Sequence, residues 1–275
     1  MPELPEVETI RRDLERLAVG RTIVSVDLGW PGSLKGPAAG LNRLRGARFI
    51  GFKRRAKMLL IELDSGDRLL VHLKMSGRLI LVSAPTPVDK HTRLIFVLDS
   101  GDQLRFIDMR KFGYVKLIES GGAQTIPELE GLGPEPLAPG FSAEDWLDLL
   151  AAKKESRRTI KSLLLDQSFI GGLGNIYVDE ILHSAGVHPQ RPVSSLRTGE
   201  IEGIYPAMRE ILMAAIERRG TTFSLYVDAE GRRGDYLDRL KVYGRRGEPC
   251  PACGRPIEKI KVAGRGTHFC PRCQR

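Results

Sequence analysis

The first six residues combine a proline at position 2 with two acidic side chains, Glu3 and Glu6. If Met1 is removed, Pro2 exposes a secondary amine. Free α-amino groups titrate near ~8, so a useful fraction is unprotonated at neutral pH. Such an amine condenses with an aldehyde-level carbon to give an iminium ion, and nearby carboxylates can shuttle protons. Taken alone, however, these residues favour a structural interpretation, because Pro5 and the acidic side chains also suit the first turn of a helix.

All four cysteines fall into one cluster near the end of the chain. Cys250 and Cys253 form one Cys-x2-Cys pair, and after sixteen intervening residues Cys270 and Cys273 form a second. This spacing is typical of a zinc ribbon, and four thiolates close the coordination shell, so we expect one structural Zn²⁺. A pair of redox motifs is the alternative, which the lack of a surrounding βαβ pattern disfavours. His268 lies close to Cys270, but with four cysteines available we interpret it as a bystander.

The charge distribution points towards a polyanionic partner. The chain has 275 residues, 41% of them hydrophobic and 28% charged, which is typical of a soluble globular protein. Of the net charge of +9, a net +7 falls between Asp238 and Arg275, where ten Lys and Arg face three Asp and Glu. On charge alone a solvated surface is a fair interpretation. A segment that is both basic and rich in cysteine favours nucleic acid.

Membrane, secretory and disulfide-rich classes are disfavoured. No apolar stretch approaches the length that spans a bilayer, and the acidic first residues lack the layout of a secretory signal. No disulfide framework runs through the chain, so we expect an intracellular, reducing compartment. That compartment corresponds to the cytoplasm.

Hydrophobic periodicity divides the chain into a strand-rich part and a helical part. Residues 5–18 have helical spacing and precede short apolar or alternating runs separated by turn signals, a pattern typical of an antiparallel β-sandwich. These runs are 22–28, 47–52, 58–63, 68–73, 78–82, 92–98, 103–107 and 114–117. A Pro- and Gly-rich stretch at 131–140 then marks a boundary. Helical patterns follow at 143–153, 157–166, 176–184 and 199–219.

The fold class is therefore predicted to be α+β with several domains. We expect an N-terminal catalytic β-sandwich with a leading helix at 1–133, a helical domain at 134–237, and a zinc-ribbon DNA-binding hairpin at 238–275. Ser142 and Ser156 are candidate N-caps, and Gly186 and Gly220 candidate helix ends.

Considered together, the motifs resemble the formamidopyrimidine-DNA glycosylase family over nearly the whole chain. Any one of them is weak, but seven in order, with the zinc cysteines, are highly specific. The motifs are Pro2-Glu-Leu-Pro-Glu-Val-Glu-Thr9, Arg54-Arg-Ala-Lys57, His72-Leu-Lys-Met-Ser-Gly77, Asp108-Met-Arg-Lys-Phe-Gly113, Gly172-Leu-Gly-Asn-Ile-Tyr177, Val242-Tyr-Gly244 and Gly264-Arg-Gly-Thr-His268. The resemblance implies a base-excision-repair enzyme with a helix–two-turn–helix domain, which excises oxidised purines such as 8-oxoguanine and formamidopyrimidines from duplex DNA.

The resemblance also implies catalytic roles. Pro2 would attack C1′ of the damaged nucleotide and expel the base, Glu3 would transfer protons at the sugar, and Glu6 would support the site. Strand cleavage would follow by β- and then δ-elimination. Lys57 would hold phosphate next to the lesion, and we group it and Arg265 with the catalytic residues. The alternative for Lys57 is a solvated edge-strand lysine among basic neighbours.

Three residues match the family's intercalating set. Because a glycosylase extrudes its target base at a cost of about a few kcal/mol, something must fill the space left in the stack. Met75 would be an apolar plug, Arg110 a cation for the opposite cytosine, and Phe112 an aromatic wedge. Met75 and Phe112 are core residues in the alternative interpretation. For Arg110, between Met109 and Lys111, we do not expect burial without a partner.

Further residues are expected to bind DNA or the lesion. Asn175, at a helix start after a glycine-rich turn, would hold a backbone phosphate, although a simple N-cap is the alternative. Arg265 in the zinc hairpin would hold others, and His91 and Lys161 are further expected DNA contacts. The loop 220–235 would close over the everted base. Its expected contacts are Thr221, Thr222 and Tyr226.

The loop 220–235 departs from the commoner family pattern at Asp235-Tyr236-Leu237, which leaves the lesion contacts open.

Three alternatives compete with this interpretation. The sister family, endonuclease VIII, shares the fold and nucleophile but prefers oxidised pyrimidines, and the intercalating set and the long loop argue against it. A non-catalytic zinc-ribbon protein would not need the pair Pro2 and Glu3. A nuclease using metal-bound water would need a cluster of ligand residues that the sequence lacks.

We expect a monomer. The resemblance to a bacterial-type DNA-repair family further implies that it lies in the cytoplasm in association with the nucleoid.

Overall fold

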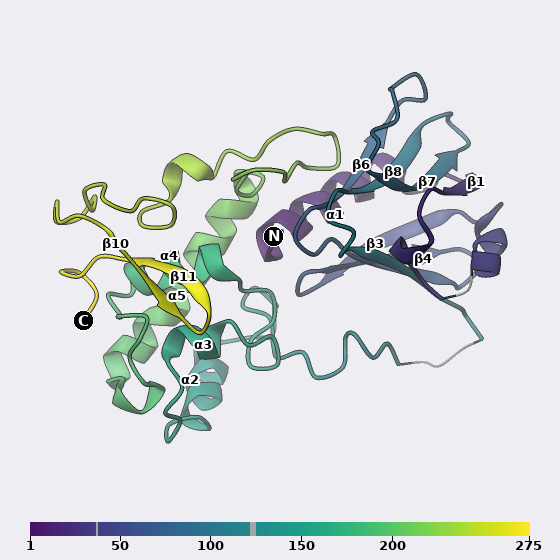
Figure 1. Ribbon diagram of the computed structural model, residues 1–275. Coiled ribbons are helices and arrows are strands. Elements are labelled where there is room, and N and C mark those ends of the chain that lie inside the picture. The colour runs from purple at the N-terminus through teal and green to yellow at the C-terminus, as the bar shows by residue number, and fades with distance from the viewer. Residues whose placement is uncertain (37, 122–124) are drawn as a thin grey trace. The chain divides into compact units, whose positions relative to one another are not determined.

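The computed structural model describes residues 1–36, 38–121 and 125–275, which form two compact units (Figure 1). The first unit comprises residues 1–130 and 216–237, and the second comprises residues 131–215 and 238–275. The change of unit after Glu130 coincides with the start of the Pro- and Gly-rich stretch. None of the helices among the described residues has the length and apolar character that a membrane crossing requires.

The first unit contains two β-sheets that share one apolar core. The four-stranded sheet has the order β1-β7-β8-β6, and the five-stranded sheet has the order β2-β9-β5-β4-β3. All neighbouring strands are antiparallel except β2 and β9. The strands are β1 (Ile23–Leu28), β2 (Leu34–Lys35), β3 (Phe49–Arg55), β4 (Met58–Leu63), β5 (Arg68–His72), β6 (Gly77–Val82), β7 (Thr92–Leu98), β8 (Gln103–Asp108) and β9 (Tyr114–Ile118). Two 3-10 helices, η1 (Pro31–Ser33) and η2 (Ala38–Leu44), join the early strands.

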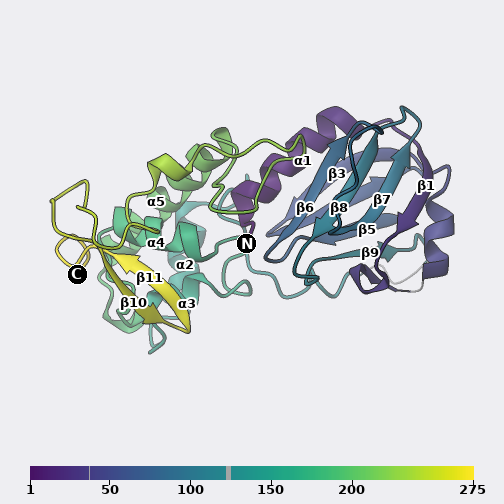
Figure 2. The ribbon, with the colours of Figure 1, turned by 45° about the horizontal axis from the view of Figure 1, so that its top comes forward.

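Helix α1 (Leu4–Ala18) runs beside the sheet that contains β3 (Figure 2). Its apolar side chains Val7, Ile10 and Leu14 recur every three to four residues and are fully or almost fully buried in the core of the unit. Burying an apolar side chain of this size is worth about 1.5–3 kcal/mol, so this stripe fixes the helix and with it the first residues of the chain.

Tight hairpin turns connect the strands as their glycines predict. In the turn between β4 and β5, Gly66 adopts a φ of 82°, and in the turn between β7 and β8, Gly101 adopts 85°. These values lie in the left-handed region that glycine enters without steric cost. The sequence prediction of a β-sandwich with one leading helix is confirmed. The short strand β2 and the two 3-10 helices carry too weak a periodicity to predict.

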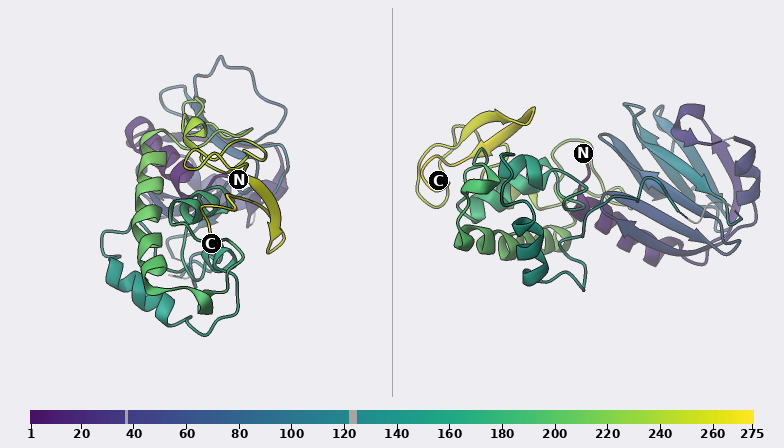
Figure 3. Two further views of the ribbon diagram at one scale, coloured as in Figure 1. Left: turned by 90° about the vertical axis from the view of Figure 1, so that its left-hand side faces the viewer. Right: turned by 90° about the horizontal axis from the view of Figure 1, so that it is seen from below.

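The second unit is mainly helical and carries the cysteine-rich hairpin. Figure 3 shows the yellow hairpin beside the teal and green helices of the same unit. The helices are α2 (Ala143–Ala151), α3 (Ile160–Leu164), α4 (Asn175–Ser184), η3 (Val193–Ser195), α5 (Thr198–Glu217) and η4 (Leu237–Arg239), and the hairpin strands are β10 (Glu258–Val262) and β11 (Arg265–Phe269). The last two residues of α5 are counted with the first unit, and η4 starts there at Leu237.

The helix boundaries follow their capping residues. Ser142 caps α2 with a reciprocal pair of hydrogen bonds to Asp145, as expected, and Gly186 follows α4 with a φ of 70°. The predicted cap Ser156 is wrong: α3 starts later, because the Thr159 hydroxyl accepts the backbone hydrogen bond of Ser162.

The α+β class is confirmed, while the three-domain division stays a prediction. Residues 216–237 pack with the N-terminal unit and residues 238–275 pack with the helices. The physical reason for the first grouping is that the loop after α5 hydrogen-bonds to α1, through Thr221 and Glu6.

Candidate functional site

The two acidic residues next to Pro2 are buried at the start of α1. Glu3 is 2% exposed and Glu6 is 1% exposed, and Pro2 is buried beside them. Glu3 is the N-cap residue, and the Glu6 carboxylate accepts the Glu3 backbone N–H at 2.8 Å. A carboxylate at the N-terminus of a helix is stabilised by the helix dipole. The helix start thus holds two buried carboxylates within four residues of the proline that would supply the amine.

The Glu6 carboxylate also fixes the start of the loop 220–235. Its second oxygen accepts the backbone N–H of Thr221 at 2.8 Å. Gly220 lies against the same side chain with a φ of 79°, and a Cβ on Gly220 would come within 2.9 Å of Glu6. Only glycine fits both this backbone conformation and this close approach.

The three predicted lesion-loop residues are buried within the first unit. The Thr222 hydroxyl donates to the Tyr226 carbonyl oxygen at 2.9 Å and accepts from Gly234 N–H at 2.8 Å. The Tyr226 hydroxyl donates to the Arg219 carbonyl oxygen at 3.0 Å, and burial raises the pKa of this phenol well above its usual value, so it remains a donor. Thr221, Thr222 and Tyr226 therefore shape the loop, and their contact with a damaged base stays a prediction.

The exposed segment 223–225 of this loop carries two apolar side chains, which the sequence reasoning missed. Phe223 is 50% exposed and Leu225 is 38% exposed, and Ser224 between them is also exposed. These three exposed positions are consecutive and lie between the buried Thr222 and Tyr226, so no alternation in the sequence predicts them.

Lys57 belongs to a cluster of positive charge. It follows Ala56, whose φ of 51° is left-handed, and is only 7% exposed, so it is not the solvated lysine of the alternative interpretation. Burial and the charges of Lys74, Lys57 and Lys35 lower the pKa of His72 to about 3. The His72 Nδ1 accepts the Lys74 backbone N–H at 3.1 Å, so the ring is neutral. Three ammonium groups around a neutral imidazole suit a phosphate.

The predicted intercalating residues lie together and are exposed. Met75 is 48% exposed and Phe112 is 56% exposed, so neither is a core residue. The Arg110 guanidinium contacts the Met75 sulfur at 3.3 Å and lies 5.1 Å from the centre of the Phe112 ring. These three residues are called the wedge below.

His91 lies in the segment before β7, and its carbonyl oxygen accepts the backbone N–H of Asp108, the last residue of β8, at 3.0 Å. Its backbone N–H donates to the Asp89 carboxylate at 2.7 Å, and its Nδ1 lies 3.3 Å from the Arg93 guanidinium. The side chain is partly exposed, so its predicted DNA contact stays a prediction.

In the second unit, Asn175 joins α4 to the hairpin. It is the first residue of α4, after the N-cap Gly174, and its side-chain N–H donates to the Gly266 carbonyl oxygen at 2.9 Å. Its side-chain oxygen is buried and has no hydrogen-bond partner among the described residues. Asn175 is therefore not the N-cap of α4, and its predicted phosphate contact stays a prediction. Arg265, next to Gly266, is exposed at the tip of the hairpin.

The expected DNA contact of Lys161 disagrees with the structure. Its side chain has no exposed surface and forms an ion pair with the equally buried Asp179 at 2.5 Å. The other oxygen of Asp179 accepts the His268 backbone N–H at 2.8 Å. An ammonium so enclosed cannot reach a phosphate, and we reassign Lys161 to holding α3, α4 and the hairpin together. Sequence alone does not distinguish a buried lysine from an exposed one on so short a helix.

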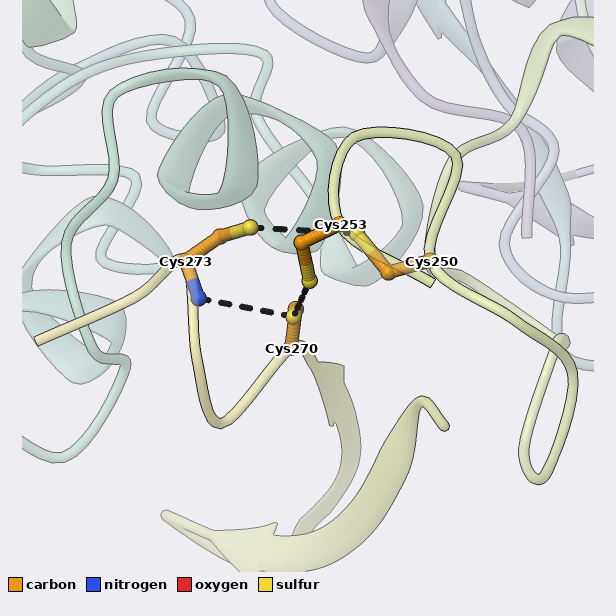
Figure 4. A group of neighbouring side chains, drawn as sticks. All are labelled: Cys250, Cys253, Cys270 and Cys273. Carbon is orange, nitrogen blue, oxygen red and sulfur yellow. Dashed lines mark hydrogen bonds between the residues drawn. The ribbon is translucent and has the colours of Figure 1, made fainter. Parts of the chain in front are cut away.

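The four cysteine sulfurs gather at one point, as Figure 4 shows. All lie within 4.8 Å of one another, with Cys250 and Cys273 at 3.9 Å and Cys253 and Cys270 at 3.5 Å. Zinc–sulfur bonds of about 2.3 Å in a tetrahedron require sulfur separations of this size, so the site fits one structural zinc ion. His268 contacts Asp179 rather than the sulfurs, which confirms that it is not a ligand.

Comparison with known proteins matches the chain from end to end. Residues 1–115 match the formamidopyrimidine-DNA glycosylase N-terminal domain, residues 132–227 its H2TH domain, and residues 247–275 the zinc finger found in FPG and IleRS. Formamidopyrimidine-DNA glycosylase of Desulforamulus reducens is 48% identical over 94% of this chain and 93% of its own length. That of Symbiobacterium thermophilum is 49% identical over 94% and 84%.

Solved structures show the same similarity. A complex of the Lactococcus lactis Fpg with DNA containing an abasic site has a TM-score of 0.91, with 39% identity over 99% of both chains. A complex of a mutant of that protein with DNA containing Fapy-dG has a TM-score of 0.92, with 39% identity over 100% of both chains.

Fold, zinc site and relatives together define a DNA glycosylase of base excision repair. More specifically, the chain belongs to the formamidopyrimidine-DNA glycosylase family, whose members are DNA N-glycosylases with AP lyase activity.

Proposed function

We propose that this chain excises oxidised purines from duplex DNA through Pro2 and then cleaves the strand. The observation that carries this proposal is the pair of buried carboxylates, Glu3 and Glu6, at the helix start next to Pro2. Solved relatives have titles that name DNA containing Fapy-dG and carbocyclic 8-oxo-G, which supports the purine class.

The proposed reaction begins at the amine that Pro2 exposes once Met1 is removed. The Pro2 nitrogen forms a bond to C1′, the glycosidic bond breaks, and the base leaves with the bonding electrons and takes up a proton. Glu3 donates a proton to the ring oxygen as the sugar opens, which leaves an iminium ion between Pro2 and C1′. Burial of the Glu3 carboxylate suits proton transfer, because bulk water is excluded from it.

Strand cleavage follows from the iminium ion. It acidifies the C2′ proton, and loss of that proton expels the 3′ phosphate by β-elimination. Loss of a further proton, from C4′, expels the 5′ phosphate by δ-elimination. Water then hydrolyses the iminium and releases the amine. Lys57, within the positive cluster around His72, would hold phosphate during these steps.

The remaining site residues would hold the DNA. The wedge would occupy the space that the everted base leaves in the stack, with Arg110 facing the opposite cytosine. In the second unit, Asn175 and the exposed Arg265 would each contact backbone phosphate, and one structural zinc ion would keep the hairpin folded.

The experiment that tests this proposal compares Glu3→Gln with the wild type on a duplex containing 8-oxoguanine. The amide keeps the size of the side chain but cannot transfer the proton, so single-turnover excision should fall by about 10²–10⁴-fold. Binding to the same duplex should persist. Excision by Glu3→Gln at the wild-type rate would show that Glu3 serves only as a helix cap.

A parallel assay on thymine glycol should show slower excision than on 8-oxoguanine, and the reverse order would contradict the purine assignment.

A further inference from the structure

Asp108 is a buried carboxylate to which the proposed chemistry gives no role. It is the last residue of β8 and has no exposed surface. One carboxylate oxygen accepts the Ser76 hydroxyl and, at 3.1 Å, the Arg110 backbone N–H. The other oxygen accepts the Gly113 backbone N–H at 2.7 Å. Hydrogen bonds to an ionised acceptor are about twice as strong as neutral ones, so this carboxylate joins its donors firmly.

The donors come from two different turns, which carry the wedge. In the pairing of β6 with β8, Gly77 faces Asp108, so the turn before β6 and the turn after β8 leave the sheet at the same end. The first turn, residues 73–76, carries Met75. The second turn, residues 109–113, carries Arg110 and Phe112. Asp108 therefore binds both turns at their common base.

Both turns have backbone conformations that need support. Lys74 has a φ of 51° and Lys111 a φ of 60°, values that side chains rarely adopt. The two backbones also lie very close together. A Cβ on Gly113, in the second turn, would come within 3.0 Å of the Leu73 carbonyl oxygen in the first. Strained conformations persist where the surrounding contacts determine them. On the two sides of Lys111, the Asp108 carboxylate supplies such contacts by accepting the backbone N–H groups of Arg110 and Gly113.

The Ser76 hydroxyl completes the connection. It donates to Asp108 and accepts the Arg110 backbone N–H at 3.1 Å, and it is 4% exposed. Arg110 is thereby fixed at its backbone by two buried oxygens. Its side chain contacts both Met75 and Phe112, although all three wedge side chains are exposed.

We propose that Asp108 is a positioning residue, which holds the wedge in one preformed arrangement and so determines the preference for the base opposite the lesion. This inference rests on the proposed function of the wedge. A preformed wedge loses less conformational freedom when it enters the duplex, and Arg110 meets the opposite base from a fixed position. Asp108 itself touches no DNA in this proposal and acts through Arg110.

The test measures binding to duplexes that contain a tetrahydrofuran abasic-site analogue opposite each of the four bases, and to undamaged duplex. Asp108→Asn keeps the shape but leaves one oxygen to serve donors on both sides. The ratio of affinities for cytosine and adenine as opposite base should fall by about 10-fold, as expected for coupled neighbouring contacts. Binding to undamaged duplex should stay within about twofold, since phosphate contacts dominate it.

Asp102→Asn is the matched control. Asp102 immediately precedes β8, the strand that Asp108 ends. It lies in the β7–β8 turn, where its carboxylate accepts the Ser100 hydroxyl at 2.8 Å. This variant should retain the wild-type preference. Ser76→Ala removes one donor to Asp108 and one acceptor for Arg110, and it should lower the preference in the same direction. If Asp108→Asn fails to fold, as judged by its thermal unfolding, the opposite-base preference of Ser76→Ala tests the role of Asp108 in its place.

Arg110→Ala separates this inference from the proposed function of the wedge. It should abolish the preference, and the double variant Asp108→Asn/Arg110→Ala should lose no more than Arg110→Ala alone. An unchanged preference in Arg110→Ala would contradict the wedge itself. A lost preference in Arg110→Ala, with the wild-type preference kept by Asp108→Asn and Ser76→Ala, would overturn the role of Asp108. Independent, additive losses in the double variant would also overturn it, because Asp108 would then not act through Arg110.

Discussion

Glu6 accepts a backbone hydrogen bond from Thr221 across 215 positions of the chain, at 2.8 Å. Its other carboxylate oxygen accepts the backbone N–H of Glu3, the residue after Pro2. One buried side chain therefore connects the start of the loop 220–235 to the start of the chain. The loop and the predicted nucleophile are held by the same group.

This connection predicts the effect of Glu6→Gln. The amide offers only one acceptor oxygen, and its NH2 group would face a backbone donor, so one buried N–H loses its partner. We expect a loss of about 1–3 kcal/mol in the free energy of unfolding. We also expect faster hydrogen exchange at the Thr221 or Glu3 amide. Denaturant unfolding and amide exchange are the measurements.

Glu15→Gln is a matched control on the same helix. Glu15 accepts the Phe52 backbone N–H at 3.0 Å, but its side chain is 47% exposed, so water replaces the lost partner. The cost should be smaller than for Glu6→Gln. Equal costs for the two variants, with unchanged exchange at Thr221, would show that the Glu6 connection contributes nothing specific.

The lowered pKa of His72 predicts a loss of stability in acid. The folded-state pKa of about 3 lies below the ordinary value of 6.5, so the unfolded chain takes up the proton first as the pH falls. The contribution of the neutral ring is present above about pH 6.5 and is lost as the pH falls towards 3. The slope is at most about 1.4 kcal/mol per pH unit.

His72→Gln removes this titration and keeps a polar group for the Lys74 backbone N–H. The free energy of unfolding should therefore fall less between pH 7 and pH 4 in His72→Gln than in the wild type. Parallel pH profiles for the two proteins would contradict the neutral, buried state of His72.

The sequence predicted most elements of the fold because their patterns are local. The period of α1, the turn glycines and the cysteine spacing each act over a few residues, and each led to the observed structure. The zinc site was predictable for the same reason. The position of the predicted wedge was predictable only through the family resemblance, because Met75 and Phe112 are ordinary core residues by type.

The remaining features depend on long-range packing that a single sequence does not reveal. From the sequence, Lys161 was predicted to contact DNA, but in the structure it is buried and paired with Asp179 on another helix. Tyr226 was predicted to contact the damaged base, and in the structure its hydroxyl donates to the Arg219 carbonyl oxygen. The role of Asp108 likewise needs the register that brings two turns together.

Two variants separate the zinc site from the predicted phosphate contact. Cys253→Ser removes one thiolate, and the small hairpin should lose zinc and its fold together. Arg265→Ala changes an exposed side chain at the hairpin tip and should retain zinc. In Arg265→Ala the slope of log K against log[salt] for DNA binding should flatten by about 1, with little change in lesion preference.

Zinc content and the salt dependence of binding should be measured on the same samples. Wild-type affinity and slope in Arg265→Ala would place that side chain away from DNA. Full zinc content in Cys253→Ser would contradict a closed site of four cysteines.

Borohydride trapping tests whether the Pro2 amine forms the covalent intermediate, because borohydride reduces the iminium between Pro2 and C1′ to a stable amine. The protein is incubated with an 8-oxoguanine duplex and borohydride, and the mass of the intact chain and of its peptides is then determined. We expect a chain that starts at Pro2, joined irreversibly to DNA through its N-terminal peptide. Efficient trapping of a chain that retains Met1, or an adduct that maps to a lysine such as Lys57, would contradict it.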